Sequence, residues 1–204
     1  NEESRQKATR YLMQSYMVEG QRSFKNEAYD ESLGYYDKAL AMNENLYKAH
    51  LGKGMIYNDM EEIDQMMEEF AMAKEGALAK NDTKTISIIN TAVDAHYNKI
   101  ITEEMEMVDP EEADYSYVVE ACENALTANP QNSRALYHLA LINNKMIEYD
   151  AAIDYALKAL EFETEAVWAS AINFELGHAY QNSVEYEKAC EALQKVVEEP
   201  FLSK

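Results

Sequence analysis

Three side chains in the C-terminal half of the sequence are of types that could hold a metal ion. They are His138, Glu175 and His178. Imidazole nitrogens and carboxylate oxygens bind Zn²⁺, and a bound Zn²⁺ could activate water for hydrolysis. The histidines lack the H-E-x-x-H spacing with which one helix presents two ligands. A metal-dependent reaction at His138 and His178 is therefore the less favoured interpretation. A polar lining of a binding surface is the favoured one, and no metal site is predicted.

Other residues that commonly carry catalysis form no recognisable motif. The sequence has no Gly-rich phosphate loop, no G-x-S-x-G turn and no cysteine paired with histidine in a known context. Cys122 and Cys190 fall at helix positions expected to face inward, so we expect buried free thiols rather than a disulfide. The protein is predicted not to be an enzyme and to need no cofactor.

Small residues recur along the sequence at a spacing of about 34 residues. The pairs are Gly20 and Gly54, Ala39 and Ala73, and Ala125 and Ala159. This spacing is typical of a solenoid built from helix-turn-helix repeats. Gly or Ala at a crossing point lets two helices approach to about 8–10 Å, and each helix pair leaves an apolar face that the next pair covers. The spacing predicts stacked helix pairs.

Composition favours the same fold class. The 204 residues include only 3 Pro and 6 Gly, and 47% are hydrophobic, which favours an all-α protein with a sizeable core. No apolar run reaches the length of a transmembrane helix. The formal net charge is −20 without a basic cluster, so nucleic acid is a poor partner.

Five repeats can be followed, and the last two are the most regular. The fourth contains Leu139, Ala140, Tyr149, Ala152, Ala156, Ala159 and Leu160, and the fifth contains Leu176, Gly177, Tyr180, Tyr186, Ala189 and Leu193. This pattern resembles the tetratricopeptide repeat family over roughly residues 13–200. Glu44 and Leu78 depart from it, because the family usually has Pro there. The resemblance implies a right-handed superhelical solenoid of antiparallel helix pairs.

The repeats divide the chain into expected segments. They are a leading helix or frayed end (1–12), five repeats (13–46, 47–80, 81–132, 133–169 and 170–200) and a tail (201–204). The chain begins at Asn1 without Met, which fits a removed export signal or a shortened chain. We expect a soluble protein, either cytoplasmic or an exported mature chain lacking its signal peptide.

The third repeat is longer than the others by about 18 residues, counted from Ala73 to Ala125. About fourteen of them fall between its two helices, which predicts two turns more on each helix and an extended hairpin at about 100–115. Asp109 and Pro110 suit the N-cap and first position of its second helix. The expected tip residues are Met105, Met107 and Val108. This acidic tip could contact a partner or a second copy, or fold back on a neighbouring repeat.

The family resemblance further implies a concave groove lined by the first helix of each repeat. Offsets from the small residues predict its lining as Met17, Gln21, Phe24, Leu51, Met55, Asn58, Ile89, Val93, His96, Tyr137, His138, Leu141, Asn144, Phe174, Glu175, His178 and Gln181. These residues are mainly apolar or amides. The Lys, Asn and Arg clamp with which some family members hold acidic chaperone tails is absent from this set.

Two functions follow from these observations. The favoured one is a non-catalytic scaffold or adaptor that binds a peptide or protein segment in the groove through apolar anchors, although the same side chains could simply pack between helices. The alternative is a structural module that associates with itself, as a homodimer, through the extended third hairpin and the terminal repeat faces.

Overall fold

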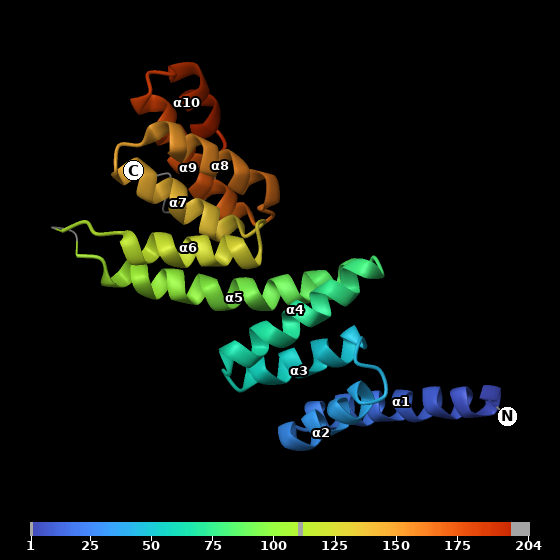
Figure 1. Cartoon of the computed structure of the whole chain (residues 1–204). Helices are drawn as coiled ribbons and strands as arrows, with labels where there is room; N and C mark the ends of the chain where they lie inside the picture. Colours follow the sequence, from blue (N-terminus) through green and yellow to red (C-terminus); the bar gives the residue numbers. More distant parts are fainter. Residues whose placement is uncertain (1, 110–111, 197–204) are drawn as a thin grey trace. The chain divides into compact units, whose positions relative to one another are not determined.

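The computed structural model describes residues 2–109 and 112–196, and these ranges contain ten α-helices and no strand (Figure 1). The helices are α1 (Glu2–Lys25), α2 (Tyr29–Leu40), α3 (Tyr47–Asp59), α4 (Ile63–Ala79), α5 (Thr83–Met107), α6 (Ser116–Ala128), α7 (Ser133–Lys145), α8 (Tyr149–Phe162), α9 (Ala166–Asn182) and α10 (Tyr186–Leu193). The all-α prediction is confirmed. In the part of the chain that is described, no helix combines the length and apolar composition needed to cross a bilayer.

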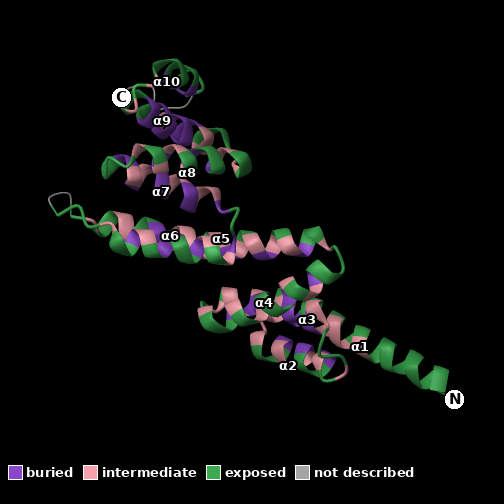
Figure 2. Cartoon of the chain, turned by 45° about the horizontal axis from the view of Figure 1, so that its top comes forward, coloured by how far each residue is buried: buried purple, intermediate pink, exposed green. Residues whose placement is uncertain are grey.

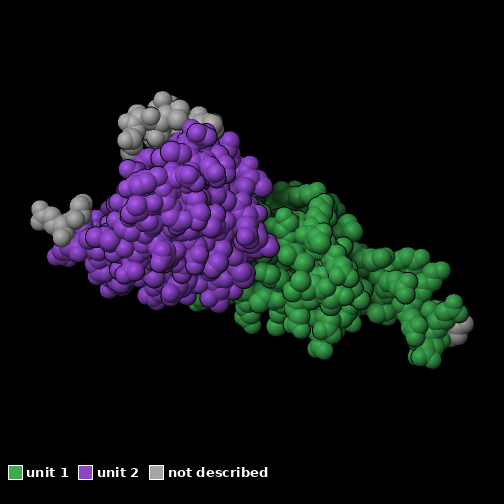
Figure 3. All heavy atoms as spheres, turned by 90° about the horizontal axis from the view of Figure 1, so that it is seen from above, with its two compact units in different colours: residues 1–92 green, residues 93–204 purple. Residues whose placement is uncertain are grey.

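The chain forms two compact units, residues 1–92 and residues 93–204 (Figure 3). In unit 1, α1 packs on α2, α3 packs on α4, and α3 also contacts α2 and α1. In unit 2, α7 packs on α8, α9 packs on α10, and α9 also contacts α8 and α7. Each unit is therefore a stack of helix pairs, as the spacing of small residues predicts.

A turn of one kind joins the helices of four pairs. Its central residue has a positive φ, at Glu27 (58°), Glu61 (58°), Ile147 (67°) and Val184 (65°). The next backbone N–H donates to a carbonyl in the last turn of the first helix, as Glu62 N does to Tyr57 O at 2.9 Å. This hydrogen bond satisfies a carbonyl that the helix end leaves free. The turn sets the antiparallel return of the second helix.

Small residues admit large side chains from the second helix of each pair. A Cβ atom on Gly20 would lie 2.9 Å from Cε1 of Tyr36, and one on Gly54 would collide with the ring of Phe70. Ser32 Oγ also donates a hydrogen bond of 2.7 Å to the carbonyl of Gly20, within the buried α1–α2 contact. The glycines thus serve close packing of a ring on a helix.

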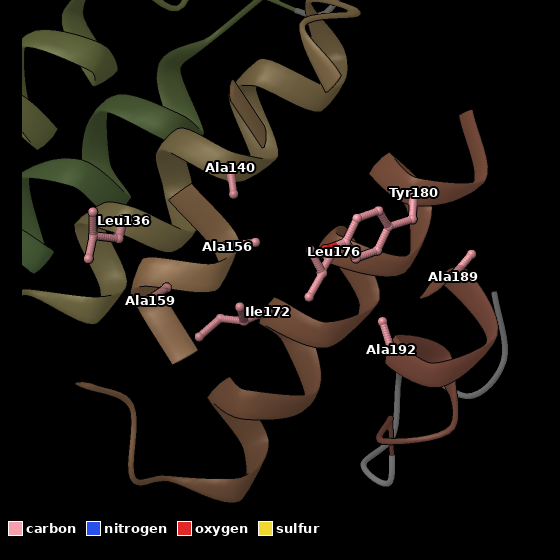
Figure 4. Close-up of a cluster of buried hydrophobic side chains, with 9 residues drawn as sticks. All are labelled: Leu136, Ala140, Ala156, Ala159, Ile172, Leu176, Tyr180, Ala189 and Ala192. Atoms are coloured by element: carbon pink, nitrogen blue, oxygen red, sulfur yellow. The ribbon is translucent and has the colours of Figure 1, made fainter. Parts of the chain in front are cut away.

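The core of unit 2 follows the same rule with alanines. Ala140, Ala156 and Ala159 give α7 and α8 a smooth face, against which Ile172 and Leu176 of α9 pack (Figure 4). Most of α9 is buried, whereas the first half of α1 is exposed (Figure 2). The stacked pairs therefore bury their apolar faces against one another.

The third helix pair differs from its prediction. α5 has 25 residues, but α6 has 13 and begins at Ser116, so only the first helix is lengthened. The predicted N-cap at Asp109 is wrong, because the Oδ1 atom of Asp114 accepts the backbone N–H of Ser116 at 3.0 Å near the start of α6. Pro110 lies outside the described residues. Of the described residues, 108–109 and 112–115 lie between α5 and α6.

The leading segment is helical, which is one of its two expected forms, and α1 runs without a break from Glu2 to Lys25. Cys122 is buried, as predicted, but Cys190 is exposed. Burial raises the pKa of the Cys122 thiol to about 12, with a smaller contribution from Glu123. Cys190 lies on α10, and no later helix in the described part of the chain covers that face.

Candidate peptide-binding groove

A cleft in unit 1 gathers side chains from α1, α3 and the first turns of α5. It has a volume of about 460 Å³. Five of its lining residues are those that the offsets place in the groove, namely Met17, Gln21, Phe24, Leu51 and Met55. The others are Val18, Tyr36, Lys48, Gly52, Asp82, Lys84, Thr85 and Ile88. The cleft is hereafter called the unit 1 groove.

The floor of the unit 1 groove is apolar and fixed by packing. Tyr36 is 4% exposed, and its ring lies between Gly20 and Gly52, where added Cβ atoms would collide with it. Met17 and Phe24 also pack against the core cluster around Tyr36. Leu51 and Met55 remain half-buried. A rigid aromatic floor is therefore bordered by side chains that still have apolar surface to bury.

The rim of the unit 1 groove carries charges that the offsets missed. The carboxylate of Asp82 accepts hydrogen bonds from Thr85 N (3.1 Å), Thr85 Oγ1 (3.0 Å) and Tyr47 Oη (3.0 Å). These bonds, led by those from Thr85, lower the pKa of Asp82, and Lys48, 4.0 Å away, adds to the effect. Lys84 is exposed on the same rim and has no ion pair with any described residue. The groove is thus more charged than expected.

Three predicted lining positions fall elsewhere. Asn58 lies outside the lining, and Ile89 and Val93 are buried in the core, at 2% and 5% exposure. Ile88 lines the groove instead of Ile89, a shift of one residue that turns a side chain by about 100° around the helix. The spacing before the third repeat is irregular, so the offsets could not predict this shift. His96 is half-buried and its ring lies edge-on to Tyr97 at 5.3 Å.

In unit 2, some side chains on the equivalent faces of α7 and α9 contact one another. The Tyr137 ring meets Trp168 edge-on at 5.5 Å, and the Arg134 guanidinium lies 4.1 Å from the centre of the Trp168 ring. Arg134 also pairs with Glu165 at 2.8 Å. Burial, followed by the charge of Glu175, raises the pKa of Tyr137 to about 12. These contacts therefore involve side chains on the surface that the offsets predict as groove lining.

Asn144 also has an internal role rather than a place in the lining. Its Nδ2 atom donates to the backbone oxygen of Glu175 at 2.9 Å and to its carboxylate at 2.8 Å. Both residues are buried, at 6% and 8% exposure. This pair therefore joins α7 to α9. Half-buried Leu141 and Phe174 and exposed His178 and Gln181 are the remaining predicted residues on these helices.

The two histidines of unit 2 are in different environments. Burial, with a smaller contribution from Arg134, lowers the pKa of His138 to about 4, so its ring is neutral at pH 7. His178 is exposed, and its Nε2 atom lies 3.3 Å from Nδ2 of Asn182. No group of three His, Cys, Asp or Glu side chains arranged to hold a metal occurs among the described residues. His138, Glu175 and His178 do not form the suggested metal site.

The three predicted hairpin-tip residues, at the end of α5, differ in their burial. Met105 and Val108 pack against the core cluster around Ile101 and Val118, whereas Met107 is 68% exposed. The segment partly folds back on its own repeat, and Met107 remains available for contact.

The last two helix pairs coincide with matches to a known family. Residues 133–165 and 170–199 match the tetratricopeptide repeat profile. These two segments are tetratricopeptide repeats. The first of these repeats contains α7 and α8, and the second contains most of α9 and all of α10. No curated protein sequence gives a significant match.

Three solved structures match most of this chain at low sequence identity, each with a TM-score below 0.5. MamA is 20% identical, with a TM-score of 0.45 over 91% of this chain and 90% of its own. YrrB, described as a TPR protein with an unusual peptide-binding site, is 18% identical, with a TM-score of 0.42 over 89% and 82%. PilF from Pseudomonas aeruginosa is 16% identical, with a TM-score of 0.40 over 93% and 77%.

Proposed function

We propose that the protein is a non-catalytic scaffold whose unit 1 groove binds an extended peptide or protein segment. The observation that carries this proposal is the convergence of half-buried Met17, Phe24, Leu51 and Met55 on one cleft of about 460 Å³. Tetratricopeptide repeat proteins commonly mediate protein–protein interactions, which is consistent with this role.

The groove suits apolar anchors. Burying a Leu, Met or Phe side chain contributes about 1.5–3 kcal/mol, and ordering of the peptide offsets part of that gain. Two or three anchors contribute about 3–9 kcal/mol before that offset, so micromolar affinity, about −8 kcal/mol, also requires hydrogen bonds to the peptide backbone. Met17 and Met55 have flexible side chains that adapt to several anchor shapes. Exposed Gln21 can hydrogen-bond the peptide backbone.

A displayed library of random peptides, selected against the full chain, tests this function. Selected peptides should carry two or more apolar residues and bind with micromolar affinity in fluorescence anisotropy. Met55→Glu should weaken binding at least about tenfold, because it places a carboxylate against apolar anchors. Asn58→Glu is the matched control, since Asn58 lies on the same helix outside the groove. Equal affinities of both variants, or no enriched peptide, would contradict the proposal.

A further inference from the structure

The first half of α1 is exposed (Figure 2). It borders a second cleft in unit 1. This cleft has a volume of about 360 Å³. It is lined by Glu2, Arg5, Gln6, Thr9, Arg10 and Met13 of α1 and by Met42 and Asn43 of the turn after α2, so its two arginines outnumber its one glutamate. It shares no lining residue with the unit 1 groove. It is hereafter called the α1 cleft.

The α1 cleft combines positive charge with apolar surface in a strongly acidic protein. Neither Arg5 nor Arg10 forms an ion pair with a described residue, although the formal net charge of the chain is −20. Met13 and Met42 are half-buried and keep part of their surface open. An acidic segment with one apolar side chain would complement this cleft in charge and in polarity.

The chain itself carries such a segment at the end of α5. Glu103, Glu106 and Met107 are spaced i, i+3 and i+4, so they share one face of the helix. All three are exposed, and neither glutamate forms an ion pair with a described residue. The opposite face carries Ile101 and Met105, which belong to the core cluster of unit 2 or pack against it. The sequence contains no Lys or Arg between Glu103 and Asp114.

We propose that the α1 cleft of one copy binds the end of α5 of a second copy. Glu103 and Glu106 pair with Arg5 and Arg10, and Met107 packs between Met13 and Met42. Two different surfaces meet in this interface, so each copy can bind one copy through its α1 cleft and another through the end of its α5. Assembly then gives either a closed ring or an open filament. The inference goes beyond peptide binding and does not depend on it, because the α1 cleft and the unit 1 groove are separate.

Sedimentation velocity on the full chain at about 100 µM, in about 50 mM NaCl, tests this interface. The wild type should sediment as species heavier than the 23.3 kDa monomer, and the heavier fraction should fall several-fold in about 500 mM NaCl because salt screens ion pairs at a surface. Arg5→Glu with Arg10→Glu should leave only monomer, and so should Glu103→Arg with Glu106→Arg.

Mixing the two double variants gives the decisive result. In the mixture, each reversed surface meets an oppositely charged one, so heavier species should return. The matched controls change the same charge at exposed sites elsewhere, Lys25→Glu with Lys145→Glu and Glu120→Arg with Glu123→Arg, and they should associate like the wild type. Circular dichroism melting shows that each variant is folded.

Several outcomes would overturn the proposal. A wild type that is monomeric at every concentration would show that no second copy occupies the cleft. Association that survives both charge reversals, or that the mixture of variants does not restore, would place the interface elsewhere. Peptide binding by the unit 1 groove would stand in either case, so the two proposals fail separately.

Discussion

The first helices of the repeats differ between the two units in what their predicted groove faces contact. These helices are α1 and α3 in unit 1 and α7 and α9 in unit 2. In unit 1, Met17, Leu51 and Met55 line an open cleft. In unit 2, Asn144 is bonded to Glu175, and Tyr137 packs on Trp168. The position of a residue in a repeat therefore does not by itself predict whether the residue lines a groove, because neighbouring side chains can already contact it.

The largest expected difference concerns the pH dependence of His138. Its folded pKa of about 4 is below the unfolded value, so between about pH 6.5 and 4 only the unfolded state takes up the proton. Stability should therefore fall as pH drops through this window, by up to about 3 kcal/mol from this residue.

Urea unfolding at pH 7 and pH 4.5 measures this contribution. His138→Asn should lose less stability than the wild type on acidification, whereas the control His178→Asn, at an exposed site, should behave like the wild type. If all three proteins lose the same stability, the account of His138 is wrong.

The Asn144–Glu175 contact should give the next largest effect. Asn144→Ala removes the donor to a buried carboxylate, and hydrogen bonds to charged groups contribute about 1.5–3 kcal/mol, so the free energy of unfolding should fall by about 2 kcal/mol. Asn58→Ala, at the matching offset in unit 1, should change it by less than about 0.5 kcal/mol. Chemical unfolding compares the two, and equal losses would remove the distinction between the units.

The turns of the two units differ by a smaller amount. The central turn residue, which has a positive φ, is Glu27 or Glu61 in unit 1. In unit 2 it is β-branched, Ile147 or Val184. A β-branched residue in this region is strained, whereas Asn tolerates it. Because both side chains are mainly exposed, at 70% and 66%, Ile147→Asn and Val184→Asn should each stabilise the protein by about 1 kcal/mol. Glu27→Asn should stabilise it less, and thermal melting in which all three variants match the wild type would contradict this.

The fold could be predicted because its signal is repeated. Gly20 and Gly54 mark where a ring of the second helix packs, and the alanines of α7 and α8 mark where side chains of α9 pack. That constraint follows from local spacing and does not require knowledge of distant contacts. The insertion in the third repeat has no counterpart in the other repeats. Comparison between repeats therefore could not locate the start of α6. Its start at Ser116 could not be derived from Asp109 and Pro110, which only resemble a helix start.

The candidate groove could be predicted only in part. Offsets from the glycines bring Met17 and Leu51 to one cleft, because α1 and α3 are regular helices. Ile88 was missed, since a shift of one residue after α4 changes the exposed face of α5. Lys48 lies three residues before Leu51 and so on the same face of α3. The helical period could therefore have predicted that Lys48 lines the groove. The bond between Asn144 and Glu175 joins residues far apart in sequence, and no local pattern shows it.

Nuclear magnetic resonance of the methionine methyl groups and of the single tryptophan tests the central claim most directly. In a titration with a selected peptide, the methyl signals of Met17 and Met55 should shift in proportion to binding. The indole signal of Trp168 in unit 2 should stay unchanged, because its face is already occupied by Tyr137 and Arg134. A shift of the Trp168 signal with unmoved Met17 and Met55 signals would contradict the account.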